Sequence, residues 1–158
     1  MYTGDVTHEL LASSVISVPP LARDESLEVS RTENARMIGY LEAGGVTTVL
    51  YGGNALLYHV ALSEYAGLLE VLVEEAADET WIIPSVGPGY GTMMDQAAVL
   101  REFDFPTAMI LPQQGVATST GIATGVRHFV EAVGKPAVLY IKQEGFMDVA
   151  DAAKLMEY

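Results

Sequence analysis

The chain has 158 residues, half of them apolar, which suits one domain with a sizeable core and excludes a disordered protein. Its 21 acidic and 8 basic residues give a formal net charge of -13, which repels nucleic-acid phosphates and anionic lipids; we expect neither a nucleic-acid nor a membrane partner. Cysteine is absent and the three histidines show no ligand spacing, so we expect no metal site, no cofactor and a reducing, cytoplasmic location.

Strand-like apolar runs alternate with helical patterns along the chain, after a short helix expected at about residues 7–12. The predicted strands are 15–18, 46–51, 80–86, 107–111 and 137–141, and the predicted helices are 32–43, 62–78, 93–103, 119–133 and a last one from residue 149. Strand starts lie roughly thirty residues apart, the length of one βα unit, which predicts a parallel sheet. An eight-unit barrel needs about 250 residues, so five units predict either an open sheet or part of a barrel.

The second predicted strand ends abruptly in Gly52, Gly53 and Asn54. A turn of this kind exposes backbone N–H groups at the carboxyl edge of a parallel sheet, where ligands bind in α/β folds. The turn is therefore a candidate cradle for an anion or a carboxylate. The alternative is that these residues only supply the positive φ angles that a tight turn needs.

The third strand is followed by the glycine-rich segment 87–91, which opens the next helix. It resembles a dinucleotide-binding loop poorly, because the last glycine comes one position early and Pro88 removes a backbone donor. A tight turn from strand to helix explains the same residues.

Tyr140 and Lys142 lie two residues apart near the carboxyl end of the last predicted strand, so their side chains are expected on one face. A buried lysine can condense with a carbonyl to form a Schiff base, and a tyrosine hydroxyl can relay protons to the intermediates. The alternatives are an exposed lysine at the end of a strand and an aromatic core residue.

Several motifs occur in the order and spacing of one known family. They are 18–20 after the first strand, 41–46 at the end of the first long helix, 52–54, 57–59 and 63–65 around the second turn, Gly87 and Gly89, Pro112, Gly121, and 138–140. With these, nearly the whole chain resembles the amino-terminal part of the dihydrodipicolinate synthase and N-acetylneuraminate lyase family of Schiff-base aldolases.

The resemblance implies an α/β fold of the TIM-barrel type, of which residues 1–158 form a single incomplete domain with about the first five β/α units. It implies a lyase or aldolase that acts on pyruvate or a related 2-keto acid held as an imine on a lysine, in a homo-oligomer. Tyr140 falls at the family's proton-relay tyrosine. Gly53 and Asn54 fall where the family holds the keto-acid carboxylate with two threonines.

The sequence departs from the family at three places. Gln114 replaces a second relay tyrosine, and Lys142 begins the segment 142–145 that replaces a Pro-Gly-Arg element after Tyr140. The imine-forming lysine belongs to a sixth strand, so we expect it beyond Tyr158 and expect the 158 residues alone to be inactive. Two alternatives stay open: a catalytically silent 2-keto-acid-binding relative, and an independent flavodoxin-like binding module.

Overall fold

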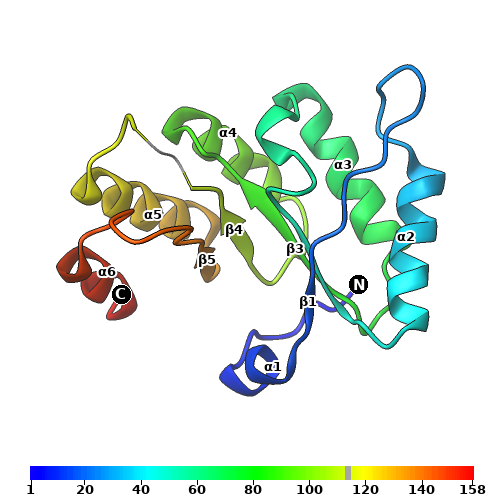
Figure 1. Ribbon diagram of the computed structural model, residues 1–158, viewed down its shortest axis with the longest axis horizontal. Helices are drawn as coiled ribbons and strands as arrows, with labels where there is room; N and C mark the ends of the chain where they lie inside the picture. The colour runs from blue at the N-terminus through cyan, green and yellow to red at the C-terminus, as the bar shows by residue number, and fades with distance from the viewer. Residues whose placement is uncertain (113–114) are drawn as a thin grey trace.

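In a computed structural model, which describes residues 1–112 and 115–158, the chain forms a five-stranded parallel sheet (Figure 1). The strands are β1 Ile16–Ser17, β2 Thr48–Tyr51, β3 Trp81–Val86, β4 Ala108–Ile110 and β5 Ala137–Leu139. They are hydrogen-bonded in sequence order, β1-β2-β3-β4-β5, and every neighbouring pair is parallel. The parallel sheet predicted from the spacing of the apolar runs is confirmed.

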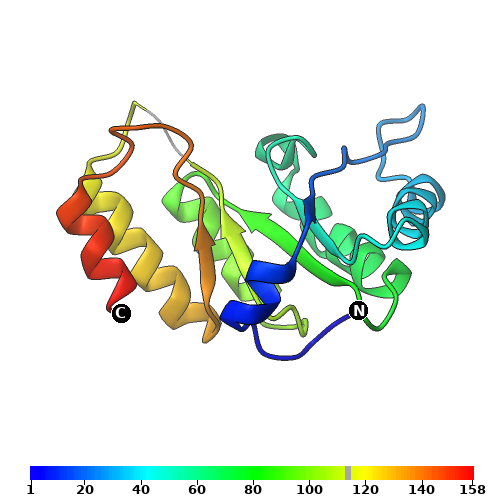
Figure 2. The ribbon, with the colours of Figure 1, turned by 60° about the horizontal axis from the view of Figure 1, so that its bottom comes forward.

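Helices connect the strands and follow the curve of the sheet (Figure 2). They are α1 His8–Ser13, α2 Arg31–Ala43, α3 Leu62–Glu75, α4 Tyr90–Leu100, α5 Ser119–Val133 and α6 Val149–Met156, with a short 3₁₀ helix η1 at Leu57–His59. From α2 to α6 each helix packs against the next one along the chain. Helix α1 lies away from this layer, across the sheet from α3 and α4 (Figure 1).

The strand order decides between the architectures that the sequence left open. A flavodoxin-like sheet has the order 2-1-3-4-5, because its chain reverses direction across the sheet and places helices on both faces. Here the order is sequential, so successive βα units advance in one direction, as they do in a barrel. The flavodoxin-like alternative is therefore wrong.

The core lies where the sheet meets the helix layer. Helix α3 buries Tyr65, Leu68, Leu69 and Leu72 at steps of three and four residues, the spacing that places side chains on one face of a helix. All six residues of β3 are buried, which is typical of a central parallel strand covered on both faces. The sheet that carries the strand ends is thus held by a continuous apolar core.

Local signals mark some element boundaries and not others. Helix α5 has its predicted bounds, because the Thr118 side chain accepts a hydrogen bond from the Gly121 N–H at the start and Gly134 adopts a left-handed φ of 70° at the end. Helix α4 begins three residues earlier than predicted, after a Gly89 N-cap without a side-chain hydrogen bond. Strand β5 ends at Leu139, two residues earlier than predicted.

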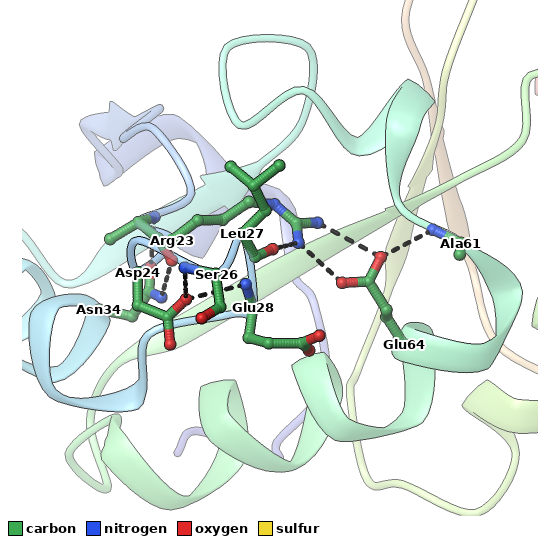
Figure 3. Close-up of polar contacts among 9 residues, drawn as sticks. Arg23, Asp24, Ser26, Leu27, Glu28, Asn34, Ala61 and Glu64 are labelled. Carbon is green, nitrogen blue, oxygen red and sulfur yellow. Dashed lines mark hydrogen bonds and ion pairs between the residues drawn. The ribbon is translucent and has the colours of Figure 1, made fainter.

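The loop between β1 and α2 is tied to the start of α3 by an ion pair (Figure 3). Arg23 Nη1 lies 2.7 Å from Glu64 Oε1 and also donates to the Leu27 carbonyl. Glu64 in turn accepts a hydrogen bond from the Ala61 N–H at 3.1 Å, which satisfies an otherwise free donor at the helix start. The pair therefore fixes a loop from one end of the sheet against the neighbouring βα unit.

Within the two described ranges, none of the helices has both the length and the apolar composition that crossing a lipid bilayer requires.

Candidate functional site

The strand register places residues from four strands in rows across the sheet. Ser85 is paired with Met109, and Met109 with Val138, while Gly52 comes opposite Ser85 because Tyr51 is paired with Pro84. We call Gly52, Ser85, Met109 and Val138 the lower row. Two residues further along the chain come Gly87, Leu111 and Tyr140, which directly follow the ends of β3, β4 and β5 and which we call the upper row. Both rows lie at the carboxyl edge, where loops of βα folds build their sites.

Tyr140 comes directly after the last residue of β5. Its neighbour Leu139 lines an apolar cavity of about 400 Å³ between α4 and α5, on the helix side of the sheet. Continued strand alternation would turn Tyr140 away from this cavity, to the face of Val138, and its electrostatic contact with Tyr58 of η1 agrees with that direction. The Tyr140 side chain is 46 % exposed and open to a ligand.

The turn after β2 offers free backbone donors. The Gly52 and Gly53 carbonyls accept hydrogen bonds from Ala55 and Leu56, which closes the turn. Within the described part of the chain, the N–H groups of Gly53 and Asn54 have no acceptor, and both residues are exposed. The Asn54 amide lies 3.5 Å from the Val18 carbonyl after β1, so it bridges two neighbouring strand ends. Two free N–H groups and an amide suit a carboxylate.

Tyr58 connects this turn to Tyr140. It lies on η1, and a Cβ atom at Gly53 would stand 3.7 Å from its ring. Partial burial raises the pKa of Tyr58, and the charge that Tyr140 would carry raises this pKa further, because a phenolate near a second phenolate is disfavoured. The two phenols are thus electrostatic neighbours from segments far apart in the sequence. Sequence reasoning gave Tyr58 no role; its place four residues after Asn54 is the signal that could have found it.

Lys142 does not share a strand with Tyr140. Strand β5 ends at Leu139, and Lys142 lies exposed in the loop that follows. The buried setting that activates a nucleophilic lysine is missing at this position. Gln114 lies outside the described residues.

The segment after β3 forms a tight turn. The Gly87 N–H, the first donor after the strand, is 2.7 Å from the buried Gln96 Oε1 of α4. This internal bond uses a donor that a phosphate would need, which favours the turn over a nucleotide loop. Among residues 1–112 and 115–158, no group of three or more acidic or histidine side chains is placed to hold a metal ion.

No protein-family model matches the sequence, and no curated protein does either. Solved structures do match the fold. Dihydrodipicolinate synthase from Bacillus clausii superposes with a TM-score of 0.79 at 15% identity, over 90% of this chain and 49% of the other. N-acetylneuraminate lyase from Fusobacterium nucleatum gives 0.77 at 15%, over 91% and 52%. A prophage protein of the dihydrodipicolinic acid synthase family from E. coli K12, solved in complex with pyruvate, gives 0.77 at 12%, over 92% and 51%.

These matches and the sequential strand order together decide the architecture. The chain has the fold of the amino-terminal half of a TIM barrel. This half-barrel spans about half the length of the solved chains that it matches. Its structural neighbours are those of the dihydrodipicolinate synthase and N-acetylneuraminate lyase family, as the sequence motifs predicted. The candidate site lies at the carboxyl edge of the half-barrel strands, between the turn at Gly53 and Tyr140.

Proposed function

We propose that the half-barrel carries the substrate-holding part of a lyase or aldolase that acts on pyruvate or a related 2-keto acid. The observation that carries this proposal is the grouping of Gly53, Asn54 and Tyr140 at one carboxyl edge of a half-barrel. Its structural neighbours support the reaction class, since they include a synthase, a lyase and a family member in complex with pyruvate.

Each part of the site has a chemical task in this proposal. The free N–H groups of Gly53 and Asn54, with the Asn54 amide, hold the carboxylate of the keto acid. Tyr140 donates a hydrogen bond to the keto oxygen and passes a proton to it. A lysine amine from outside these 158 residues attacks the keto carbon, and the resulting carbinolamine loses water to give the imine. The Tyr140 phenolate takes back a proton from the attacking nitrogen and then gives it to the leaving hydroxyl, which departs as water.

Borohydride trapping tests the proposal directly. The 158-residue chain and any longer product of the same reading frame are incubated with pyruvate and sodium borohydride, and their intact masses are measured. Reduction of the imine fixes the pyruvate carbons on the amine that attacked. We expect an adduct on the longer product only. An adduct on the short chain would assign the nucleophile to a lysine within it, first of all Lys142.

Two tyrosine variants distinguish a chemical role of the Tyr140 hydroxyl from an unspecific effect of a Tyr→Phe substitution. Tyr140→Phe removes the hydroxyl at the site and is expected to slow adduct formation in the longer product by about 100-fold, the scale of a lost general acid. Tyr40→Phe removes an exposed hydroxyl on α2, where Tyr40 is 82 % exposed, and is expected to change nothing. Pyruvate binding without any adduct would indicate the catalytically silent relative, and absence of binding would exclude both functions.

A further inference from the structure

A buried hydroxyl lies in the lower row directly beneath the candidate site. Ser85 Oγ is fully buried and has no hydrogen-bond partner among the described residues. An unpartnered buried hydroxyl destabilises the folded chain, because it loses its bonds to water and gains none in return. The position of Ser85 in the half-barrel therefore needs an explanation.

The end of the Met109 side chain fills the space between Ser85 and Gly52. Gly52, opposite Ser85 in the row, has no side chain, and a Cβ atom there would stand 3.4 Å from Ser85 Oγ and 2.7 Å from Met109 Cε. The space that a residue at position 52 would fill is thus occupied by the end of the Met109 side chain. A thioether chain with three rotatable bonds is the most adaptable apolar side chain, so its methyl group can move at little cost.

Among residues 1–112 and 115–158, two other buried side-chain polar atoms lack partners, and their positions differ from that of Ser85. Tyr51 Oη belongs to the opposite face of β2, since Tyr51 precedes Gly52 by one residue. Burial raises the pKa of Tyr51 to about 12, so this phenol stays neutral. Trp81 Nε1 lies at the amino end of β3, far along the strand from the site. Ser85 alone of the three lies on the ligand side, next to the upper row.

We propose that Ser85 is a substrate-binding residue, whose hydroxyl donates a hydrogen bond to an oxygen of the bound 2-keto acid once the Met109 methyl has moved aside. The inference rests on the proposed function and adds to it a polar contact on the floor of the site, below Tyr140. The ligand would supply the partner that Ser85 Oγ lacks among the described residues, so the cost of removing this hydroxyl from water would be offset in the complex.

The test compares two variants that each delete one unpartnered hydroxyl. Ser85→Ala and Tyr51→Phe are made in the longest folded product of the reading frame, and pyruvate affinity is measured by isothermal titration calorimetry. Denaturant midpoints are measured without ligand. Both variants are expected to unfold at or above the wild-type midpoint, because each removes an unsatisfied buried group. Only Ser85→Ala is expected to weaken pyruvate binding, by about tenfold, the worth of one hydrogen bond.

The outcomes are distinguishable. An unchanged pyruvate affinity in Ser85→Ala overturns the role of Ser85 and leaves the proposed function intact. A wild-type protein that binds no pyruvate overturns the proposed function and this inference together. If the smaller alanine side chain lowers the midpoint, Ser85→Cys repeats the comparison with nearly unchanged volume and a much weaker donor, and the same tenfold loss is expected.

Discussion

At the scale of single residues, strain marks the loops around the candidate site. Leu27 and Leu56 adopt positive φ angles of 66° and 55°, and both side chains are largely exposed. This conformation costs a residue with a Cβ atom about 1–2 kcal/mol of conformational free energy, whereas glycine adopts it freely. Leu56 follows the turn of Gly53 and Asn54 and starts η1, so the turn geometry imposes the strain.

Leu56→Gly is expected to leave the free energy of unfolding unchanged or to raise it by up to about 1 kcal/mol, because the relief of strain exceeds the added entropy of the unfolded chain. The control is Leu62→Gly, an exposed leucine in ordinary helical conformation at the start of α3, which should cost about 1 kcal/mol. Urea unfolding of the two variants measures the difference. Equal losses at both positions would contradict strain at Leu56.

Some features of the candidate site depend on residues close together in the chain, and others depend on contacts between distant segments. The turn at Gly53 and Asn54 is closed by hydrogen bonds between residues close together in the chain, and the carboxylate cradle expected there stays a prediction. The link between Tyr58 and Tyr140 depends on two segments that meet only after the sheet has formed. The place of Tyr58 four residues after Asn54 indicates that it is near the turn, but no local pattern encodes its meeting with Tyr140.

At the scale of elements, helix α5 shows how boundary signals and packing act together. Gly125 lies in the middle of the helix, where a Cβ atom would make ordinary contacts of 3.5 Å to Met93 and 3.6 Å to Tyr90. Gly134 ends the helix with a φ of 70°, which alanine adopts only with strain. A methyl group therefore fits at Gly125, whereas at Gly134 it would be strained.

Gly125→Ala is expected to raise the free energy of unfolding by about 1 kcal/mol through helix propensity, since the methyl group fits. Gly134→Ala is expected to lower it by about 1 kcal/mol through the strained φ angle. Thermal or urea unfolding of the pair measures both signs in one helix. A loss at Gly125 would show that the space beside Met93 and Tyr90 is tighter than the structure has it.

Element boundaries were predicted to within one residue where a side-chain cap or a glycine marks them, as at the start of α2 and at both ends of α5. Helix α5 has a threonine cap and a glycine stop, and both ends were predicted correctly. Helix α4 starts behind a glycine that forms no side-chain cap, so its first turn left no signal in the sequence. Strand β5 loses its last two predicted residues because apolar character alone does not secure a pairing partner.

At the scale of the whole molecule, the Arg23–Glu64 pair joins the first βα unit to the second. The hydrogen bond from Arg23, and then that from the Ala61 N–H, lowers the pKa of Glu64 below its ordinary value of 4.5. A lowered carboxyl pKa stabilises the folded state above the unfolded pKa, and this stability is lost as the pH falls through the folded value. The contribution is therefore fully present at neutral pH and absent in strong acid.

Glu64→Gln is expected to lower the free energy of unfolding by about 1 kcal/mol at pH 7, and the difference from wild type should vanish as the pH falls well below 4.5. Urea unfolding at several pH values measures this. The matched control is Glu33→Gln, whose partner Arg36 lies 3.0 Å away on the same exposed helix face. Its effect should stay within about 0.5 kcal/mol. A difference at Glu64 that persists unchanged in acid would contradict the ionic origin.

The sequence by itself determined the local features of this protein: the alternation of strands and helices, the parallel direction of the sheet, and the turn that frees two N–H groups. Each depends on residues close together in the chain, through periodicity, capping and short-range hydrogen bonds, and none of Gly52, Gly53 and Asn54 adopts the positive φ angle that was the alternative for this turn. Only the tertiary structure decided the strand order, and with it the choice of a half-barrel over a doubly wound sheet. It also decided that Tyr140 neighbours Tyr58 and that Ser85 lies beneath the site. These depend on which strands pair and in what register, a choice made by the packing of the whole core.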